Sequence, residues 1–124
     1  MARYVDGFVI PIPTRNVPRY RRIARRAGEI WMEYGAVEYI ECVGDDLDIK
    51  GLVSFKKLVK VKKGETVLFS FIVYRSRADR DKVNARVLKD PRIANMMTEK
   101  DSPFDMKRMT HGGFRTIVDL QEPL

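Results

Sequence analysis

The sequence predicts an α+β fold of the ferredoxin-like type, a βαββαβ sandwich with an antiparallel sheet and both helices on one face. Three observations predict it: an apolar strand near the middle of the chain, a long amphipathic helix before it and a second helix directly after it. The central segment, residues 66–74, carries no charge and reads Thr-Val-Leu-Phe-Ser-Phe-Ile-Val-Tyr. Its two alternating rows are both apolar, so we expect both faces of the sheet to be covered.

The composition predicts one soluble domain that spans residues 1–124. Hydrophobic residues make up 44% of the 124 residues and charged residues 33%, which is typical of a globular chain. No apolar run approaches the roughly 20 residues that a membrane span needs, and the N-terminus lacks the apolar core of a secretion signal. Cys42 is the single cysteine, which excludes an internal disulfide and favours a cytoplasmic location.

The N-terminal half is predicted to contain a strand, a long helix and a second strand. Alternation within the first strand places Asp6 in an otherwise apolar row. Apolar residues then recur at steps of three and four, which predicts a helix with Thr14 or Asn16 as N-cap and Gly35 as C′ residue. The predicted segments are the strands at 4–12 and 36–43, a loop at 44–51, a connector at 52–61 and a turn at 62–65.

The C-terminal half is predicted to contain two helices and the last strand. Ser76 has the spacing of a helix cap, and Asp90-Pro91 ends that helix and begins a short second one. The apolar side of the short helix is formed by Ile93, Met96 and Met97. A loop at 98–108 leads to a strand at 109–120, in which Gly112-Gly113 predicts a bulge or a close approach of another group.

The apolar pattern also predicts a homodimer. Right-handed crossovers place both helices on one face of the sheet, which leaves the other face bare. Because a monomer rarely exposes so large an apolar patch, we expect a second copy to cover it through the open sheet face. The two sheets would then form the core of a dimeric α/β barrel.

Several strings resemble the YbaA-like family of small bacterial proteins, a domain of unknown function. They are residues 4–8 (YVDGF), 41–46 (ECVGDD), 90–92 (DPR), 103–109 (PFDMKRM) and 112–114 (GGF), and they cover nearly the whole chain in order. The resemblance implies a ferredoxin-like dimeric α/β barrel, in agreement with the pattern above. It implies no established activity.

Three polar residues inside predicted strands are candidate site residues. His111 is the only histidine, and its ordinary pKa lets it exchange protons near neutrality. Asp6 and Glu41 are carboxylates in strands that should be covered, so each needs a hydrogen-bond donor, a cation or a ligand. Glu41 and His111 are therefore the catalytic candidates, and all three are ligand-binding candidates. Structural roles for the same residues are the alternative.

A loop before the last strand supplies the remaining ligand-binding candidates, Phe104 and Arg108, since loops at sheet ends often carry ligand groups. A salt-bridged turn is the alternative for Arg108. Cys42 should be a buried, inert cysteine, because strand alternation points it away from Glu41. Asp45, Asp46 and Asp48 lack the spacing of a calcium loop and no zinc set occurs, so we predict no metal and no cofactor.

Two functions follow from these patterns, and the sequence does not decide whether either includes a reaction. The first is binding of a small molecule in a polar cleft. The alternative is electrostatic binding of RNA, since the net charge of +7 is concentrated in Arg15, Arg19, Arg22 and Arg26 and in residues 56–63. The usual RNA-binding module with this sheet needs exposed aromatics on the sheet and a defined signature, and neither is found as a match.

Overall fold

The computed structural model describes residues 2–96 and 102–123 as a four-stranded antiparallel sheet with the strand order β2-β3-β1-β4. This is the arrangement predicted for a βαββαβ chain, in which each helix connects two strands that have a third strand between them. The elements are β1 (Tyr4–Pro13), α1 (Val17–Glu33), β2 (Glu38–Val43), α2 (Phe55–Leu58), β3 (Glu65–Tyr74), α3 (Arg77–Lys89), α4 (Pro91–Met96) and β4 (Thr110–Arg115). Short 3-10 turns at Thr14–Asn16 and Met106–Arg108 precede α1 and β4.

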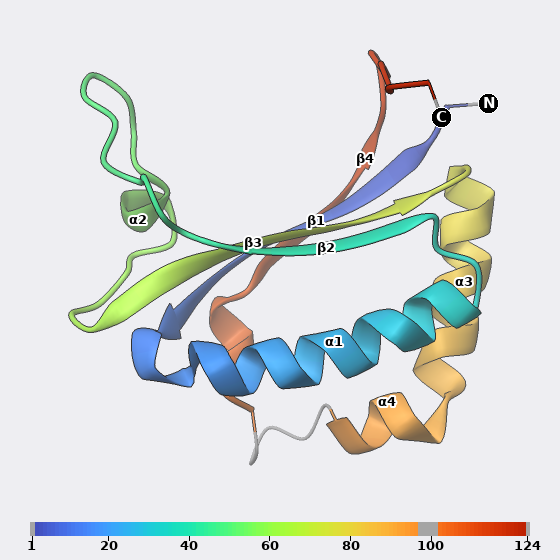
Figure 1. The fold of residues 1–124 in the computed structure, drawn as a ribbon, viewed down its shortest axis with the longest axis horizontal. Coiled ribbons are helices and arrows are strands. Elements are labelled where there is room, and N and C mark those ends of the chain that lie inside the picture. The colour runs from blue at the N-terminus through green and yellow to red at the C-terminus, as the bar shows by residue number, and fades with distance from the viewer. Residues whose placement is uncertain (1, 97–101, 124) are drawn as a thin grey trace.

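The three longer helices lie on one side of the sheet. Figure 1 shows α1 and α4 below the strands, α3 running down from the right-hand end of β3, and the short α2 above the strands. Val83 and Val87 of α3 share a core cluster with Ile30 of α1 and Ile93 of α4. The predicted placement of both crossover helices on one face is therefore confirmed. None of the helices in the described part of the chain is long and apolar enough to cross a membrane.

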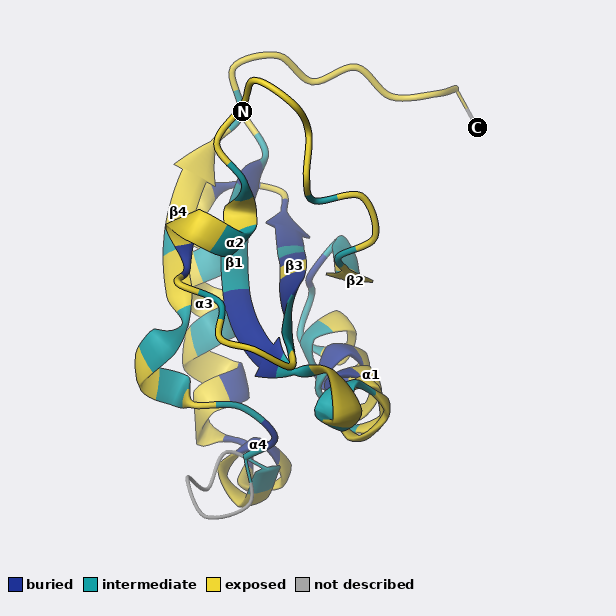
Figure 2. Cartoon of the chain, turned by 90° about the vertical axis from the view of Figure 1, so that its left-hand side faces the viewer, coloured by how far each residue is buried: buried dark blue, intermediate teal, exposed yellow. Residues whose placement is uncertain are grey.

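The alternation of buried residues follows the predicted parity of the strands. One row of β1 points toward the helices and is buried at Tyr4, Asp6, Ile10 and Ile12. The paired row of β3 points the same way and is buried at Leu68, Ser70, Ile72 and Tyr74. The dark central strands in Figure 2 show the result, a core between the middle of the sheet and the helices. The helices contribute mainly Tyr20, Ala24, Ile30, Val83, Val87 and Ile93 to that core.

The predicted helix boundaries are mostly confirmed. Ser76 accepts a hydrogen bond from the Asp79 amide at 3.1 Å, and Asp90 accepts one from the Arg92 amide at 2.8 Å. Gly35 has φ +116°, the left-handed conformation that a helix C′ position requires. Asn16 lies at the predicted N-cap position of α1, but its side chain makes no capping hydrogen bond and donates instead to the Pro103 carbonyl at 2.8 Å.

Two elements differ from the prediction. The connector contains α2, which Ser54 caps by accepting a hydrogen bond from the Lys56 amide. The last strand ends at Arg115 instead of residue 120. Arg115 pairs with Tyr4, the first residue of β1, so β1 offers no pairing partner beyond that point. Met97 and part of the loop predicted at 98–108 lie outside the described residues.

The glycine pair in β4 was predicted to mark either a bulge or a close approach of another group, and the structure shows the close approach. A Cβ on Gly113 would overlap the Tyr4 hydroxyl and would lie 2.9 Å from an Arg80 nitrogen. The register with β1 runs without a bulge through Gly112 and Gly113. Gly113 has to be small because the side chains of Tyr4 and Arg80 lie directly against it.

The face of the sheet away from the long helices is only partly covered. Phe69 is 44% exposed and Phe114 62% exposed, so this open face does present aromatic rings. Phe55 of α2 packs edge-on against Phe69, with ring centroids 6.2 Å apart. The prediction of a buried cysteine was wrong: Cys42 is exposed, because β2 is an edge strand and Cys42 lies on its uncovered side.

Candidate functional site

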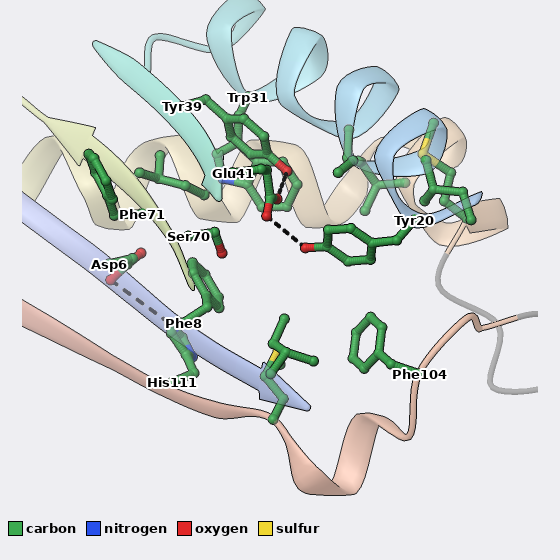
Figure 3. A pocket seen from close by; sticks show the side chains of 18 of the residues that line it. Asp6, Phe8, Tyr20, Trp31, Tyr39, Glu41, Ser70, Phe71, Phe104 and His111 are labelled. Atoms are coloured by element: carbon green, nitrogen blue, oxygen red, sulfur yellow. Dashed lines mark hydrogen bonds and ion pairs between the residues drawn. The ribbon is translucent and has the colours of Figure 1, made fainter. Parts of the chain in front are cut away.

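A cavity of about 320 Å³ lies between the sheet and helix α1, closed at one end by the segment that leads into β4. Its walls are mainly apolar and aromatic, and a few polar groups lie at the sheet surface. Figure 3 shows these side chains converging from the sheet, from α1 and from the loop before β4. Four of the five predicted ligand-binding residues line it: Asp6, Glu41, Phe104 and His111.

Strand register brings these polar residues together. Glu41 of β2 lies opposite Ser70 of β3, Ser70 lies opposite Phe8 of β1, and Phe8 lies opposite His111 of β4. Directly opposed residues in an antiparallel sheet point to the same face, so one row crosses all four strands. Asp6 lies two residues from Phe8 and therefore projects from the same face beside that row.

Glu41 is held by two phenols. The Tyr20 hydroxyl donates to Oε1 and the Tyr39 hydroxyl donates to Oε2, each at 2.8 Å (Figure 3). Burial raises the pKa of Glu41, while the hydroxyls of Tyr20, Tyr39 and Ser70 act in the opposite direction. Burial also raises the pKa of both tyrosines, and the nearby carboxylate adds to the effect. The phenols therefore stay protonated and act as hydrogen-bond donors.

Asp6 is the most deeply buried acidic group of the cavity, with 1% of its surface exposed. Its Oδ2 accepts a hydrogen bond from Asn84 Nδ2 at 3.2 Å. Its Oδ1 has no hydrogen-bond partner among the described residues: Arg80 Nε lies 3.7 Å away and His111 Nε2 3.9 Å away. Both distances exceed those of a hydrogen bond. The carboxylate thus has one oxygen that is ion-paired with Arg80 at longer range and accepts no hydrogen bond from the described residues.

His111 lies at the edge of the cavity. Its ring stacks on Phe8 with the centroids 4.5 Å apart and the planes 3° from parallel, and 42% of its side chain is exposed. The stack holds the imidazole with Nε2 toward Asp6 (Figure 3). The imidazole therefore presents a hydrogen-bonding nitrogen to a molecule in the cavity.

Four further residues of the site were not recognised from the sequence: Tyr20, Trp31, Tyr39 and Asn84. The first two belong to the apolar stripe of α1, which predicts core packing and gives no sign of a polar role. Asn84 Oδ1 accepts hydrogen bonds from the Trp31 indole at 3.1 Å and from the Tyr74 hydroxyl at 2.9 Å. Because Asn84 also donates to Asp6, one side chain of α3 connects α1, β3 and β1 at the cavity wall.

Phe104 closes the end of the cavity. Its ring meets Tyr20 edge-on at a centroid distance of 5.8 Å, and Pro103 and Met109 line the wall beside it. Gly28 of α1 makes room for one of the wall residues, since a Cβ there would lie 2.5 Å from carbons of the Tyr39 ring. The glycine therefore leaves the space in which Tyr39 reaches Glu41.

Arg108 does not line the cavity. Its guanidinium makes two hydrogen bonds to the Glu65 carboxylate, at 2.7 and 2.9 Å, and a third to the Lys60 carbonyl at 3.0 Å. The Arg108 pairing lowers the pKa of Glu65 to about 2. This is the salt-bridged turn that was the alternative for Arg108, and it fixes the entry to β4 beside the start of β3.

Replacing Arg108 with glutamine is expected to lower stability and leave the cavity unchanged. The loss at pH 7 should be about 1–2 kcal/mol, since two charge-assisted bonds are lost from a partly exposed pair. The pKa of Glu65 is lowered on folding, so its contribution is complete above the ordinary value of 4.5 and disappears as the pH falls toward 2. Urea unfolding of both proteins between pH 7 and pH 2 should show the two converging. Lys107→Gln is the matched control, and a pH-independent difference for Arg108→Gln would contradict the assignment.

The described residues contain no group of three or more histidine, cysteine, aspartate or glutamate side chains that could hold a metal ion. The cavity can instead accept hydrogen bonds at its two carboxylates and surround an apolar body with rings.

The sequence matches a known protein family over most of its length. Residues 3–106 match the model of a protein family of unknown function, DUF1428. The chain belongs to this family.

One curated relative is the uncharacterised protein YbaA of Escherichia coli strain K12. It is 38% identical over 117 residues, which cover 94% of this chain and 98% of the relative. A protein of the same description from Shigella flexneri matches with the same identity and coverage. The resemblance to the YbaA-like family noted from short strings is thus confirmed over most of the DUF1428 chain.

Solved structures confirm the ferredoxin-like fold of this DUF1428 protein. A dimeric ferredoxin-like protein from an uncultured marine organism superposes with a TM-score of 0.58 at 9% identity, covering 97% of this chain and all of the other. A NIPSNAP family protein of unknown function from Agrobacterium tumefaciens superposes with a TM-score of 0.56 at 14% identity, covering 93% of this chain and 88% of the other. At such identities the likeness concerns the fold alone.

Proposed function

We propose that this DUF1428 protein is a homodimeric small-molecule-binding domain whose ligand occupies the cavity between α1 and the sheet. The observation that carries the proposal is the Asp6 carboxylate, 1% exposed, with an acceptor oxygen that has no hydrogen-bond partner among the described residues. A buried polar group without a partner is costly, and a ligand that donates a hydrogen bond removes this cost. Asp6, Glu41, His111 and Phe104 are the proposed ligand-binding residues.

The shape of the cavity supports the proposal. Small-molecule sites are concave, largely apolar and contain a few placed polar groups, and cavities of about 300 Å³ lie at the lower end of their size range. Here three polar side chains, Asp6, Glu41 and His111, come from three different strands and meet in one cavity. Glu41 and His111 are the groups that a proton-transfer reaction would use, since both can exchange protons with a bound molecule.

The homodimer is supported by the open face of the sheet. Its rings at Phe69 and Phe114 are exposed in the single chain, and one structural neighbour is described as a dimeric ferredoxin-like protein. Pairing of two open faces would bury these rings, as expected for an isologous contact. We place the protein in the cytoplasm, since its single cysteine is exposed and has no intrachain partner, which suits a reducing compartment.

A thermal-shift screen against a metabolite panel at two salt concentrations tests the proposal. A ligand at about 100 times its dissociation constant should add roughly 2.7 kcal/mol of stability, and this gain should survive added salt. Glu41→Gln should weaken a true cavity ligand about tenfold or more, because the carboxylate loses its charge and its symmetric pair of acceptors. Glu29→Gln, at an exposed position of α1, is the matched control. A hit that both variants bind as tightly as the parent does not occupy this cavity.

Electrostatic binding of RNA is the second candidate function, and the exposed face of α1 favours it. Six arginines of this helix and the turn before it are exposed: Arg15, Arg19, Arg21, Arg22, Arg25 and Arg26. The other basic segment, 56–63, begins within α2 on the opposite side of the sheet (Figure 1). Its far end reaches the start of α1, where the Thr14 amide donates to the Gly64 carbonyl at 2.9 Å. Binding through these basic segments should weaken steeply with salt. An RNA interaction that is absent at low ionic strength would remove this candidate.

A further inference from the structure

We propose that the ligand of this cavity is an organic amine with an aromatic or otherwise apolar body, bound as a cation. The inference rests on the proposed function and adds the chemical class of the ligand. Three features of the cavity support it: the charges of its lining, the Asp6 oxygen that accepts no hydrogen bond from the described residues, and the rings that surround the remaining space.

The charged groups of the lining have the opposite sign from the rest of the protein. The chain carries a net charge of +7, yet the described residues that line the cavity include two carboxylates, Asp6 and Glu41, and no lysine or arginine. An anionic ligand would meet these carboxylates in a poorly solvated space, which is strongly unfavourable. A cation would be attracted by both carboxylates, and at Asp6 it would share the charge with Arg80, whose Nε lies 3.7 Å from Oδ1. The two carboxylates therefore argue against an anionic ligand.

The Asp6 carboxylate would be best satisfied by a strong hydrogen-bond donor. Its Oδ1 faces Arg80 and His111 at distances of 3.7 and 3.9 Å, which are attractive but too long for hydrogen bonds. An ammonium group has three N–H donors and carries the charge that compensates a buried carboxylate. Placed against Oδ1, it would make the bond that Arg80 and His111 leave open.

Aromatic rings line the rest of the cavity. Phe8, Tyr20, Trp31, Tyr39 and Phe104 all contribute to its wall. The face of an aromatic ring attracts a cation, and the ring body packs well against apolar or aromatic groups. Carboxylates combined with rings are the surroundings that an ammonium group on an apolar body would fit. A neutral alcohol would use the same hydrogen-bond acceptors and the same rings, but it would gain nothing from the two negative charges.

Three ligands of similar shape and different charge separate these alternatives: phenethylamine, 2-phenylethanol and 3-phenylpropionate. Trp31 is the single tryptophan and lines the cavity, so its fluorescence reports binding directly. With the full-length protein at pH 7.5, and with calorimetry as a second readout, the amine should bind at least about tenfold more tightly than the alcohol. The acid should bind more weakly than both. Equal binding of amine and alcohol, or tightest binding of the acid, would overturn the amine assignment while the cavity function stands.

Substitution of the carboxylates tests where the preference arises. Asp6→Asn should reduce the amine-to-alcohol preference toward one, a change of about tenfold or 1.4 kcal/mol, because the charge is removed at constant shape. Glu41→Gln provides the same test at the other carboxylate if Asp6→Asn fails to fold. Asp46→Asn, at an exposed loop position, is the matched control and should keep the full preference. A preference that survives in both cavity variants would contradict the proposal.

A neutral apolar dye, N-phenyl-1-naphthylamine, separates failure of the amine assignment from failure of the cavity function. If the three phenyl compounds do not bind but the dye binds and quenches Trp31, the amine assignment is wrong and the small-molecule function stands. If neither the compounds nor the dye change Trp31 fluorescence, both proposals fail.

Discussion

Replacing Phe69 with aspartate is expected to convert the proposed dimer into monomers. Phe69 lies in the middle of the open face, with its ring 44% exposed and packed edge-on against Phe55 and Phe71 at centroid distances of 6.2 and 6.1 Å. In a symmetric dimer the new carboxylate would be buried twice, and each unpaired buried charge costs several kcal/mol. The dissociation constant should therefore rise at least about 100-fold. Sedimentation velocity over a range of protein concentrations measures this change.

The matched control is Met32→Asp, which introduces the same charge at an exposed apolar residue of α1. Met32 is 45% exposed and lies on the side of the sheet away from the open face. This variant should keep the parent's dimer affinity. If Phe69→Asp remains as dimeric as the parent protein, the open face is not the contact between the two copies.

Replacing Asn84 with alanine is expected to cause the largest loss of folding stability among polar substitutions near the cavity. Trp31, Tyr74 and Asp6 would each lose a hydrogen bond to one side chain. Leaving a buried polar group without its partner costs about 1–3 kcal/mol, so for three groups we expect a total of about 3–9 kcal/mol. That is a large part of the stability of an ordinary domain. Urea unfolding at one fixed protein concentration measures the change, since a dimer's stability depends on concentration.

Asn95→Ala is the control for this experiment. Asn95 is an exposed residue of α4, and the same substitution there should change the unfolding free energy by less than about 0.5 kcal/mol. A similarly small effect at Asn84 would mean that water replaces the three lost hydrogen bonds. The part of the cavity beside Asn84 would then be more open to water than the burial of Asp6 indicates.

The sequence by itself determined the order of the elements and the face on which most strand residues lie. The period-two pattern of β1 placed Asp6 beside buried neighbours, and the same pattern in β3 predicted that both sides of the sheet need cover. Caps such as Ser76 and Asp90 were predictable because a cap depends on a few adjacent residues. These features are local, so local patterns carry them.

Only the tertiary structure decided which side chains meet. A strand pattern gives the face of a residue and says nothing of its neighbour on the next strand, so the row that joins Glu41 to His111 depends on the register. Asn84 shows the same limit, since its three partners come from three other elements. Arg108 was a ligand-binding candidate with a salt-bridged turn as the alternative, and the fold decides for the salt bridge by placing Glu65 within 2.7 Å of it. Contacts between residues distant in sequence are fixed by packing, and for this protein packing decides the composition of the candidate site.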